Sequence, residues 1–134
     1  MKIVFDTNVL ISAFIAIGPS KDVFEYVVEN HDVILSPYIL KELREKLLRK
    51  LGFSREEYKE IEEILTGSVV ISIEESGKAP NFSDKKDLPV LDLCISVEAD
   101  LLITGDKQIQ KLKRIGQTKV VSPSEFWNVE KEWL

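Results

Sequence analysis

Short apolar runs that alternate with longer segments of helical period constrain the fold of this chain more than any other feature. Residues 2–6 are rich in β-branched side chains and end at an aspartate, a pattern typical of a buried parallel strand. Four similar runs follow, at residues 32–36, 68–73, 101–104 and 119–121. Because strands that alternate with helices form parallel sheets covered on both faces, we expect an α/β fold. The expected architecture is a three-layer α/β/α arrangement around a central, mostly parallel sheet of about five strands.

Capping residues and helix breakers set the boundaries of the expected helices. Ser36, followed by a proline, is expected to cap one helix, and Ser54 begins a capping box for the next. Ser20 is expected to cap the helix before the second strand. Residues 107–114 are expected to form a short helix, and residues 74–86 are expected to form the one long loop. Loops of such length often carry function.

The composition is that of a soluble globular domain. With 134 residues the chain is expected to form a single domain over residues 1–134. It has no apolar run near the roughly 20 residues that span a membrane, and its start has no signal-peptide pattern, so we expect a cytoplasmic protein. A single cysteine, Cys94, and a single histidine, His31, exclude an internal disulfide and a Cys/His zinc cluster. We expect Cys94 to be an inert core residue and His31 to lie at a surface turn.

Two aspartates lie where the active sites of parallel sheets gather, beyond the carboxyl ends of the strands. Asp6 closes the first expected strand, and Asp106 follows the fourth, in the segment Thr104-Gly105-Asp106. Each aspartate also precedes an expected helix, where aspartate is a favoured N-cap, so a purely structural role is an alternative for either one. Two such aspartates in one sheet make the purely structural role less convincing.

Further acids belong to neighbouring helices. Glu42 lies at the margin of the apolar stripe on the helix after the second strand, although a glutamate among so many charged residues is more often a solvated partner. Asp87 is expected at the cap of the helix after the long loop. Asp84 and Asp92 lie near Asp87 and compete with it for a place in the site.

Carboxylates that gather without a histidine or a thiolate indicate a site for a hard cation. Oxygen ligands suit Mg²⁺ or Mn²⁺, and Mg²⁺ typically takes few carboxylates while it keeps waters and substrate phosphates. Several acids at close quarters cannot all stay ionised without a cation. The chemistry that follows is metal-assisted hydrolysis of a phosphodiester, in which the ion generates hydroxide and stabilises the leaving oxygen.

Four segments of the chain resemble the motifs of the PIN-domain nucleases. The opening IVFDTNVL, with Asp6, resembles their first motif, and SPYILKEL, with Glu42, is similar to the second. DKKDLPVL, with Asp87, resembles the third motif, and ADLLITGDK, with Asp106, resembles the fourth. The order, spacing and strand context of the segments agree over almost the whole chain. Within the family, the chain looks like the small prokaryotic branch of VapC-like toxins from toxin–antitoxin pairs.

The resemblance implies Mg²⁺- or Mn²⁺-dependent cleavage of single-stranded RNA by an activated water, on a PIN-like fold. It implies an antitoxin protein as a partner, a homodimer, and Asn8 and Thr104 as residues that orient carboxylates and waters. Many relatives carry another aspartate two residues after the fourth acid. Here that residue is Gln108, so one metal ion or two are both open. The implied metal ligands and catalytic residues are Asp6, Glu42, Asp87 and Asp106.

The charge of the chain neither favours nor excludes a nucleic-acid substrate. A net charge of −5 argues against broad binding to the phosphate backbone. The segment 107–119, however, contains five basic residues and no acid. We expect Lys107, Lys111 and Arg44, which lie close in sequence to the proposed acids, to contact RNA. A solvated basic face is the alternative for each of them.

Two other functions stay open. The first is a non-catalytic PIN-like module that binds RNA or a protein partner. The second treats Asp6 and the residues after it as an aspartyl phosphotransfer motif, but that chemistry needs a second aspartate where the chain has Asn8. Replacement of Asp6 by alanine separates the first alternative from a nuclease, because only a nuclease would lose cleavage and metal binding.

Overall fold

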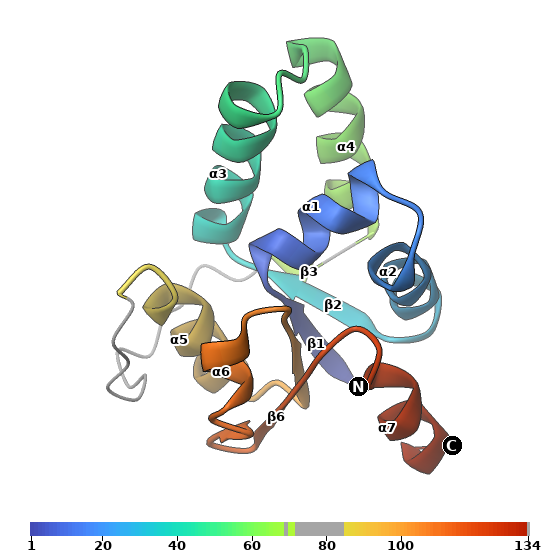
Figure 1. The fold of residues 1–134 in the computed structure, drawn as a ribbon, viewed down its shortest axis with the longest axis vertical. Helices are drawn as coiled ribbons and strands as arrows, with labels where there is room; N and C mark the ends of the chain where they lie inside the picture. Colours follow the sequence, from blue (N-terminus) through green and yellow to red (C-terminus); the bar gives the residue numbers. More distant parts are fainter. Residues whose placement is uncertain (69, 72–84, 134) are drawn as a thin grey trace.

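A six-stranded sheet forms the centre of the molecule (Figure 1). The computed structural model describes residues 1–68, 70–71 and 85–133. The strands are β1 Lys2–Phe5, β2 Asp32–Leu35, β3 Val70–Ile71, β4 Leu101–Ile103, β5 Arg114–Ile115 and β6 Thr118–Val121. Their order across the sheet is β3-β2-β1-β4-β6-β5. Of these strands, β5 is antiparallel to its neighbour, and the other pairs are parallel.

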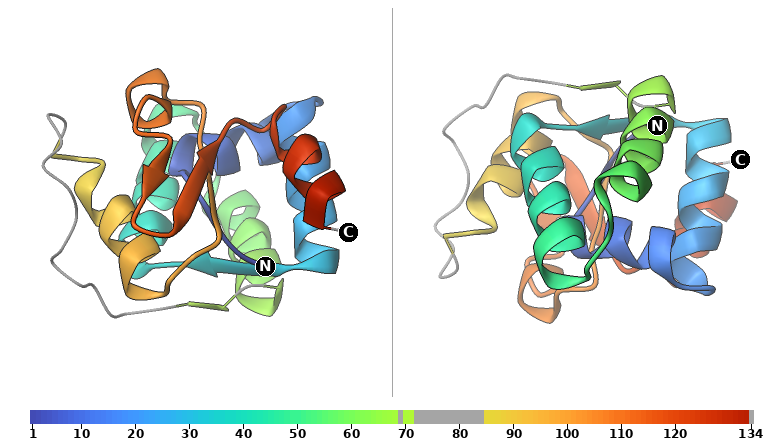
Figure 2. Two further views of the ribbon diagram at one scale, coloured as in Figure 1. Left: turned by 90° about the horizontal axis from the view of Figure 1, so that it is seen from below. Right: turned by 90° about the horizontal axis from the view of Figure 1, so that it is seen from above.

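Helices cover both faces of the sheet. They are α1 Thr7–Ile15, α2 Pro19–Asn30, α3 Pro37–Glu45, its continuation as the π-helix η1 Lys46–Lys50, α4 Arg55–Ser68, α5 Leu88–Ser96, α6 Lys107–Gln110 and α7 Phe126–Trp133. In both views of Figure 2, α5 lies on one side of the strands, and α2 and α7 lie on the other. The predicted α/β/α fold with a mostly parallel sheet is therefore confirmed. Among the described residues, no helix has both the length and the apolar character needed to cross a membrane.

The middle strand β1 brings the carboxyl ends of two chain segments together. It pairs with β2 on one side, where Ile3 lies opposite Val33, and with β4 on the other, where Ile3 lies opposite Leu101. Just beyond β1, the backbone N–H of Asp6 donates to the carbonyl of Ile103 over 3.0 Å. The ends of β1 and β4 therefore lie side by side, at the edge where parallel sheets place their active sites.

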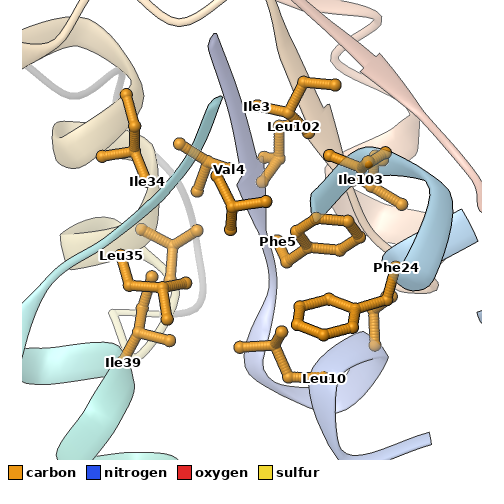
Figure 3. Packing of buried hydrophobic residues seen from close by; sticks show 14 of the residues in the cluster. Ile3, Val4, Phe5, Leu10, Phe24, Ile34, Leu35, Ile39, Leu102 and Ile103 are labelled. Carbon is orange, nitrogen blue, oxygen red and sulfur yellow. The ribbon is translucent and has the colours of Figure 1, made fainter. Parts of the chain in front are cut away.

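The interior strand β1 is buried on both of its faces. Its three apolar residues are fully buried, and the ring of Phe5 packs against Phe24 of α2 with ring centroids 5.4 Å apart. Val4 points to the other side of the strand, toward Leu35 (Figure 3). Because β1 carries apolar side chains on both of its faces, their burial requires helices packed against both faces of the sheet. Cys94 also belongs to this core, as predicted, and burial raises the pKa of its thiol to about 12.

One expected helix is shorter than the sequence predicted. The helix α6 ends at Gln110 rather than at residue 114, because Arg114 begins the short strand β5. Arg114 pairs with Lys119 in an antiparallel hairpin, and Gly116 turns the chain there with a φ of +59°. A strand of two residues has too little periodicity to be recognised from sequence.

Two of the three predicted serine caps are confirmed. The Ser36 side chain accepts a hydrogen bond from the first turn of α3 over 3.2 Å, and Ser54 forms both bonds of its capping box over 3.0 Å. The prediction for Ser20 is wrong, because α2 already begins at Pro19. The fixed φ of proline suits the first helical position, so the helix starts two residues earlier than a cap at Ser20 would require.

His31 is not the surface-turn residue that the sequence predicted. Its side chain is 4% exposed, and its Nε2 atom lies 2.7 Å from Oε2 of Glu130 on α7. The hydroxyl of Tyr26 donates to the other oxygen of Glu130 over 2.8 Å. The sequence around His31 carries no sign of this partner, which lies 99 residues further along the chain.

Some predictions fall on residues outside the described ranges. Of the predicted strand over residues 68–73, Val70–Ile71 is described as the strand β3. Most of the predicted loop over residues 74–86 lies outside the described residues, and Asp84 lies there as well.

Candidate functional site

Asp6 lies at the floor of the candidate site, directly after β1. It is 6% exposed, and both of its carboxylate oxygens accept hydrogen bonds. Oδ1 accepts from the backbone N–H of Thr7 over 2.8 Å, which makes Asp6 the N-cap of α1. Oδ2 accepts from the hydroxyl of Thr104 over 2.8 Å. Asp6 therefore does cap a helix, as the structural alternative predicted, but the cap uses only one of its two carboxylate oxygens.

Thr104 links Asp6 to Asp106. Its hydroxyl donates to Asp6 and accepts from the backbone N–H of Asp106 over 3.1 Å. Asp106 caps α6, because its Oδ1 atom accepts from the N–H groups of Gln108 and Ile109 over 2.8 and 3.2 Å. The buried hydroxyl thus fixes the position of two acids from different strand ends relative to each other.

Glu42 reaches the same site from α3. The hydroxyl of Thr7 donates to Oε1 of Glu42 over 2.8 Å. Because the backbone of Thr7 bonds Asp6 while its side chain bonds Glu42, this one residue connects two of the proposed acids. The sequence prediction gave Thr7 no role. A hydroxyl next to a strand-end aspartate was the available signal, but its partner on α3 could be known only from the fold.

The electrostatics of Asp6 also place three acids together. Burial raises the pKa of Asp6 above its ordinary value of 3.8, and the hydrogen bonds from Thr104 and Thr7 oppose this shift. The negative charges of Glu42 and Asp106 raise the pKa of Asp6 further. Buried carboxylates that repel one another are a feature of functional sites, where a cation or a substrate relieves the repulsion.

The remaining proposed acids lie at the border of this group. Asp87 precedes the first residue of α5 and is partly exposed, and its charge is not among those that shift the pKa of Asp6. The segment before it touches α3, since the Tyr38 hydroxyl donates to the carbonyl of Lys86 over 2.9 Å. Asp92 is partly buried further along α5. The described contacts therefore bring together Asp6, Glu42 and Asp106, with Asp87 beside them in the fold.

Asn8 was expected to orient the carboxylates of the site, but its described hydrogen bond is with a lysine. Its Oδ1 atom accepts a hydrogen bond from Nζ of Lys46 over 3.1 Å. Lys46 is the first residue of η1, so this bond joins the first turn of α1 to the end of α3. The contact of Lys46 with Asn8 could not be predicted from the sequence, because it depends on how α1 and α3 pack.

Two basic hollows lie next to Glu42 along α3 and η1. The first has a volume of about 490 Å³ and is lined by Tyr38, Lys41, Glu42, Glu45, Lys46, Arg49, Lys50 and Lys86. The second has a volume of about 540 Å³ and is lined by Lys41, Arg44, Glu45, Leu48, Arg49, Phe53 and Arg55. Together their linings hold seven basic and two acidic residues, so this surface is locally basic although the chain is acidic overall.

The three predicted RNA contacts lie in different surroundings. Arg44 lines the second hollow, and its guanidinium lies over the ring of Tyr58, 5.9 Å from the ring centroid. Lys107 and Lys111 are exposed at α6, directly after Asp106, and neither belongs to the lining of the two basic hollows. The hollow next to Glu42 is therefore lined by basic residues other than those that the sequence singled out.

The acids suit a hydrated divalent cation better than a tightly coordinated one. Among the described residues, no group of three or more His, Cys, Asp or Glu side chains is close enough to bind one ion directly. Mg²⁺ is commonly held by one or two carboxylates and keeps several waters. The oxygen-only donor set of Asp6, Glu42 and Asp106, with its unrelieved repulsion, fits that type of binding.

Comparisons with known proteins agree with this architecture. A family model described as PIN domain matches residues 2–108. No curated protein sequence gives a significant match. Among solved structures, a chain of VapBC2 from Rickettsia felis, crystallised bound to a DNA fragment from the promoter, has a similar fold with a TM-score of 0.69. The two sequences are 18% identical, and the match covers 91% of this chain and 98% of that chain. At this identity the structural likeness concerns the fold alone.

Proposed function

Because this chain belongs to the PIN-domain family, we propose that it is a metal-dependent endoribonuclease that hydrolyses phosphodiester bonds of single-stranded RNA. The observation that carries the proposal is the link from Asp6 through the Thr104 hydroxyl to Asp106. Glu42 lies close enough for its charge to act on Asp6. A fold that buries an acid beside two others retains an electrostatic cost, which is typical of a site kept for its chemistry.

A bound Mg²⁺ or Mn²⁺ would supply an activated water and stabilise the leaving oxygen of the phosphodiester. The residues that would hold it, directly or through waters, are Asp6, Glu42, Asp87 and Asp106. Asp6 is held in place at both ends of its carboxylate, because each of its oxygens accepts one hydrogen bond. A carboxylate oxygen can accept a second interaction, so these bonds leave Asp6 able to act as a ligand.

Glu42 is proposed to accept the proton of the attacking water. Thr7 holds its Oε1 atom over 2.8 Å, while its Oε2 atom lies at the weak distance of 3.5 Å from the Tyr38 hydroxyl. Glu42 also lines the hollow through which a substrate would approach. One oxygen is therefore fixed by the protein, and the other is the better placed to receive a proton.

The basic residues along α3 and η1 are proposed to receive the RNA backbone. A polynucleotide carries one negative charge per nucleotide, and lysine and arginine side chains neutralise these charges. Arg44 remains a proposed contact, and Lys107 and Lys111 are proposed to contact the substrate on the side of Asp106. Acids that bind a cation and basic residues beside them together suit a phosphodiester substrate.

A protein partner is proposed on the strength of the structural comparison. The matching structure is VapBC2, and we infer by analogy that this chain is the toxin of a toxin–antitoxin pair and binds an antitoxin. A homodimer is proposed on the resemblance to the PIN-domain family alone. Size-exclusion chromatography with light scattering on the purified chain tests the homodimer, and co-purification with the protein encoded next to it tests the antitoxin.

The decisive experiment combines metal binding with RNA cleavage. Titration calorimetry with Mn²⁺ compares the wild-type chain with Asp106→Asn, which keeps the size of the side chain and the capping oxygen. Asp22→Asn, at an exposed position of α2, is the matched control. We expect saturable Mn²⁺ binding and cleavage of a fluorescent single-stranded RNA by the wild type and by Asp22→Asn, and loss of both in Asp106→Asn. A folded wild type that neither binds Mn²⁺ nor cleaves RNA would overturn the proposal.

A non-catalytic module that binds RNA is the second candidate. The observation in its favour is that no three of the described acids lie close enough together to ligate one ion directly. Such a module would bind single-stranded RNA equally well with and without Asp106. RNA binding without cleavage, in the presence of Mn²⁺, would favour this candidate.

A further inference from the structure

We propose that Lys46 binds the phosphate group of the substrate next to the acidic site. This inference rests on the proposed function, because it assumes that a phosphodiester is brought to Asp6, Glu42 and Asp106. It goes beyond that function by assigning the phosphate contact to one basic residue beside the acids. The assignment depends on three features: the position of Lys46, its free charge and the π-helical turn that it begins.

Lys46 lies close to the acids through two neighbours. Its Nζ atom donates to Oδ1 of Asn8 over 3.1 Å, and Asn8 is two residues after Asp6. Lys46 is also one helical turn after Glu42, and its backbone N–H donates to the Glu42 carbonyl. Lys46 and Glu42 line the same hollow of about 490 Å³. A phosphate that sits at the acids is therefore within the neighbourhood that the Lys46 side chain can reach.

The charge of Lys46 has no counter-ion within the described part of the chain. No carboxylate there lies within ion-pair distance of its ammonium, although acids are abundant nearby. An ammonium group has three hydrogens to donate, and the bond to Asn8 uses one of them. The side chain is partly buried, so its position is more restricted than that of a lysine in solvent. An accessible ammonium that is held by one hydrogen bond and has spare donors is suited to bind an anion.

The π-helical turn extends this basic surface away from the acids. The Leu51 N–H donates to the carbonyl of Lys46 over 3.0 Å, which is a spacing of five residues. This wider turn gives a smaller rotation per residue than an α-helix, and Lys46, Arg49 and Lys50 all line the hollow that contains Glu42. Leu47 stays fully buried in the core. π-helical turns are frequently found at functional sites, and here the turn keeps basic residues in one row.

Binding of a phosphodiester requires a positive contact at this position. The carboxylates of the site repel a phosphate, and a metal ion offsets only part of that repulsion. Arg44 is engaged with the ring of Tyr58 and lines the other hollow. Lys46 is therefore a basic side chain that a described hydrogen bond ties to Asn8, two residues after Asp6.

The test measures both binding and cleavage of a short fluorescein-labelled oligouridylate. Binding is measured by anisotropy at several salt concentrations, in the Asp106→Asn background that is expected not to cleave. Lys46→Gln is compared with Lys131→Gln, which removes the same charge from an exposed position of α7. Lys46→Cys provides a second test, because treatment with bromoethylamine rebuilds an amine there, while the buried Cys94 is protected from the reagent.

We expect Lys46→Gln to weaken RNA binding about tenfold and to lower the salt slope by about one, and Lys131→Gln to leave both unchanged. In the cleaving chain, kcat/KM should fall about tenfold to a hundredfold, and aminoethylation of Lys46→Cys should restore most of it. Lys46→Gln that behaves like Lys131→Gln in a cleaving chain would overturn the inference and leave the proposed function intact. RNA binding that depends on Lys46 without any wild-type cleavage would overturn the proposed function alone. A wild type that neither binds nor cleaves would overturn both.

Discussion

The hydroxyl of Thr104 lies 2.8 Å from Oδ2 of Asp6 and donates a hydrogen bond to it in the buried floor of the site. Thr104→Val keeps the shape of the side chain and removes this donor. Because the hydrogen bond opposes the rise in the pKa of Asp6, its loss should raise that pKa further and shift Mn²⁺ binding to higher pH. We expect cleavage to fall about tenfold to a hundredfold and stability to fall by about 1–2 kcal/mol. Calorimetric Mn²⁺ titration across pH checks the shift.

Thr104→Ser is the matched control for this prediction. It keeps the hydroxyl, so the pH dependence of Mn²⁺ binding should match that of the wild type, and only a small loss of stability from the missing methyl group is expected. Equal pH profiles for Thr104→Val and Thr104→Ser would show that the hydroxyl does not tune Asp6.

The raised pKa of Asp6 makes stability depend on pH in a defined direction. Burial raises this pKa above 3.8, so the folded chain keeps a proton on Asp6 at pH values where the unfolded chain has lost it. The contribution of Asp6 to the free energy of unfolding therefore decreases as pH rises from about 3.8 through the raised pKa. Asp6→Asn removes this contribution, and we expect its melting temperature to exceed that of the wild type near neutral pH and not at low pH.

Thermal unfolding at pH 3.5 and pH 7.5, with and without Mn²⁺, tests the pH prediction. The expected difference in melting temperature between Asp6→Asn and the wild type is on the order of a few degrees, because the underlying change in free energy is small. Asp22→Asn on α2 is the control, and its melting temperature should follow that of the wild type at both pH values. Mn²⁺ should raise the melting temperature of the wild type but not that of Asp6→Asn. A melting temperature of Asp6→Asn below that of the wild type at pH 7.5 would contradict the prediction.

The sequence was sufficient for the architecture because the architecture depends on local patterns. The strand run that ends at Asp6 and the cap at Ser36 are written in consecutive residues, and both are found as predicted. The short strand β5 and the turn at Gly116 were missed, because a strand of two residues is defined by its pairing with Thr118–Val121 and not by its own pattern. Local patterns predict elements, whereas pairing partners come from the fold.

The candidate site was predictable in its acids and in Thr104, which the family resemblance singled out and which bonds Asp6. Asp6 and Asp106 follow strands, so chain position alone brought them to one edge of the sheet. The contacts of Thr7 with Glu42 and of Lys46 with Asn8 depend on the packing of α1 against α3, which no local pattern encodes. Thr7 and Lys46, whose partners lie on another helix, were therefore harder to predict than the acids themselves.

Replacement of glycine by alanine should change the free energy of unfolding in opposite directions at Gly116 and at Gly67. Gly116 has a φ of +59° in the β5–β6 hairpin, where a side chain is strained, so Gly116→Ala should lower the free energy of unfolding by about 1–2 kcal/mol. Gly67 lies within α4, with no atom within 4 Å of an added Cβ, so Gly67→Ala should raise it by about 0.5–1 kcal/mol. Urea unfolding measures both changes. Effects of the same sign would contradict the assigned backbone conformations.

The pair of His31 and Glu130 fixes α7 at the edge of the sheet opposite the candidate site. Nε2 of His31 lies 2.7 Å from a buried oxygen of Glu130, and Tyr26 donates to the other oxygen. Glu130→Leu would leave the two donors without their acceptor in a buried position. We expect the free energy of unfolding to fall by about 2–4 kcal/mol, with cleavage by the remaining folded chain unchanged.

Glu132→Leu is the matched control, because Glu132 is exposed on the same helix. Its free energy of unfolding should stay within about 0.5 kcal/mol of the wild type. Urea unfolding followed by tryptophan fluorescence measures both variants, and one of the two tryptophans, Trp127, lies beside Tyr26 and Phe126 at ring-centroid distances of 5.0 and 5.1 Å. Glu130→Leu with the stability of Glu132→Leu would show that the buried hydrogen bonds of Glu130 do not hold α7. Loss of RNA cleavage by folded Glu130→Leu would instead show that the two edges of the sheet are coupled.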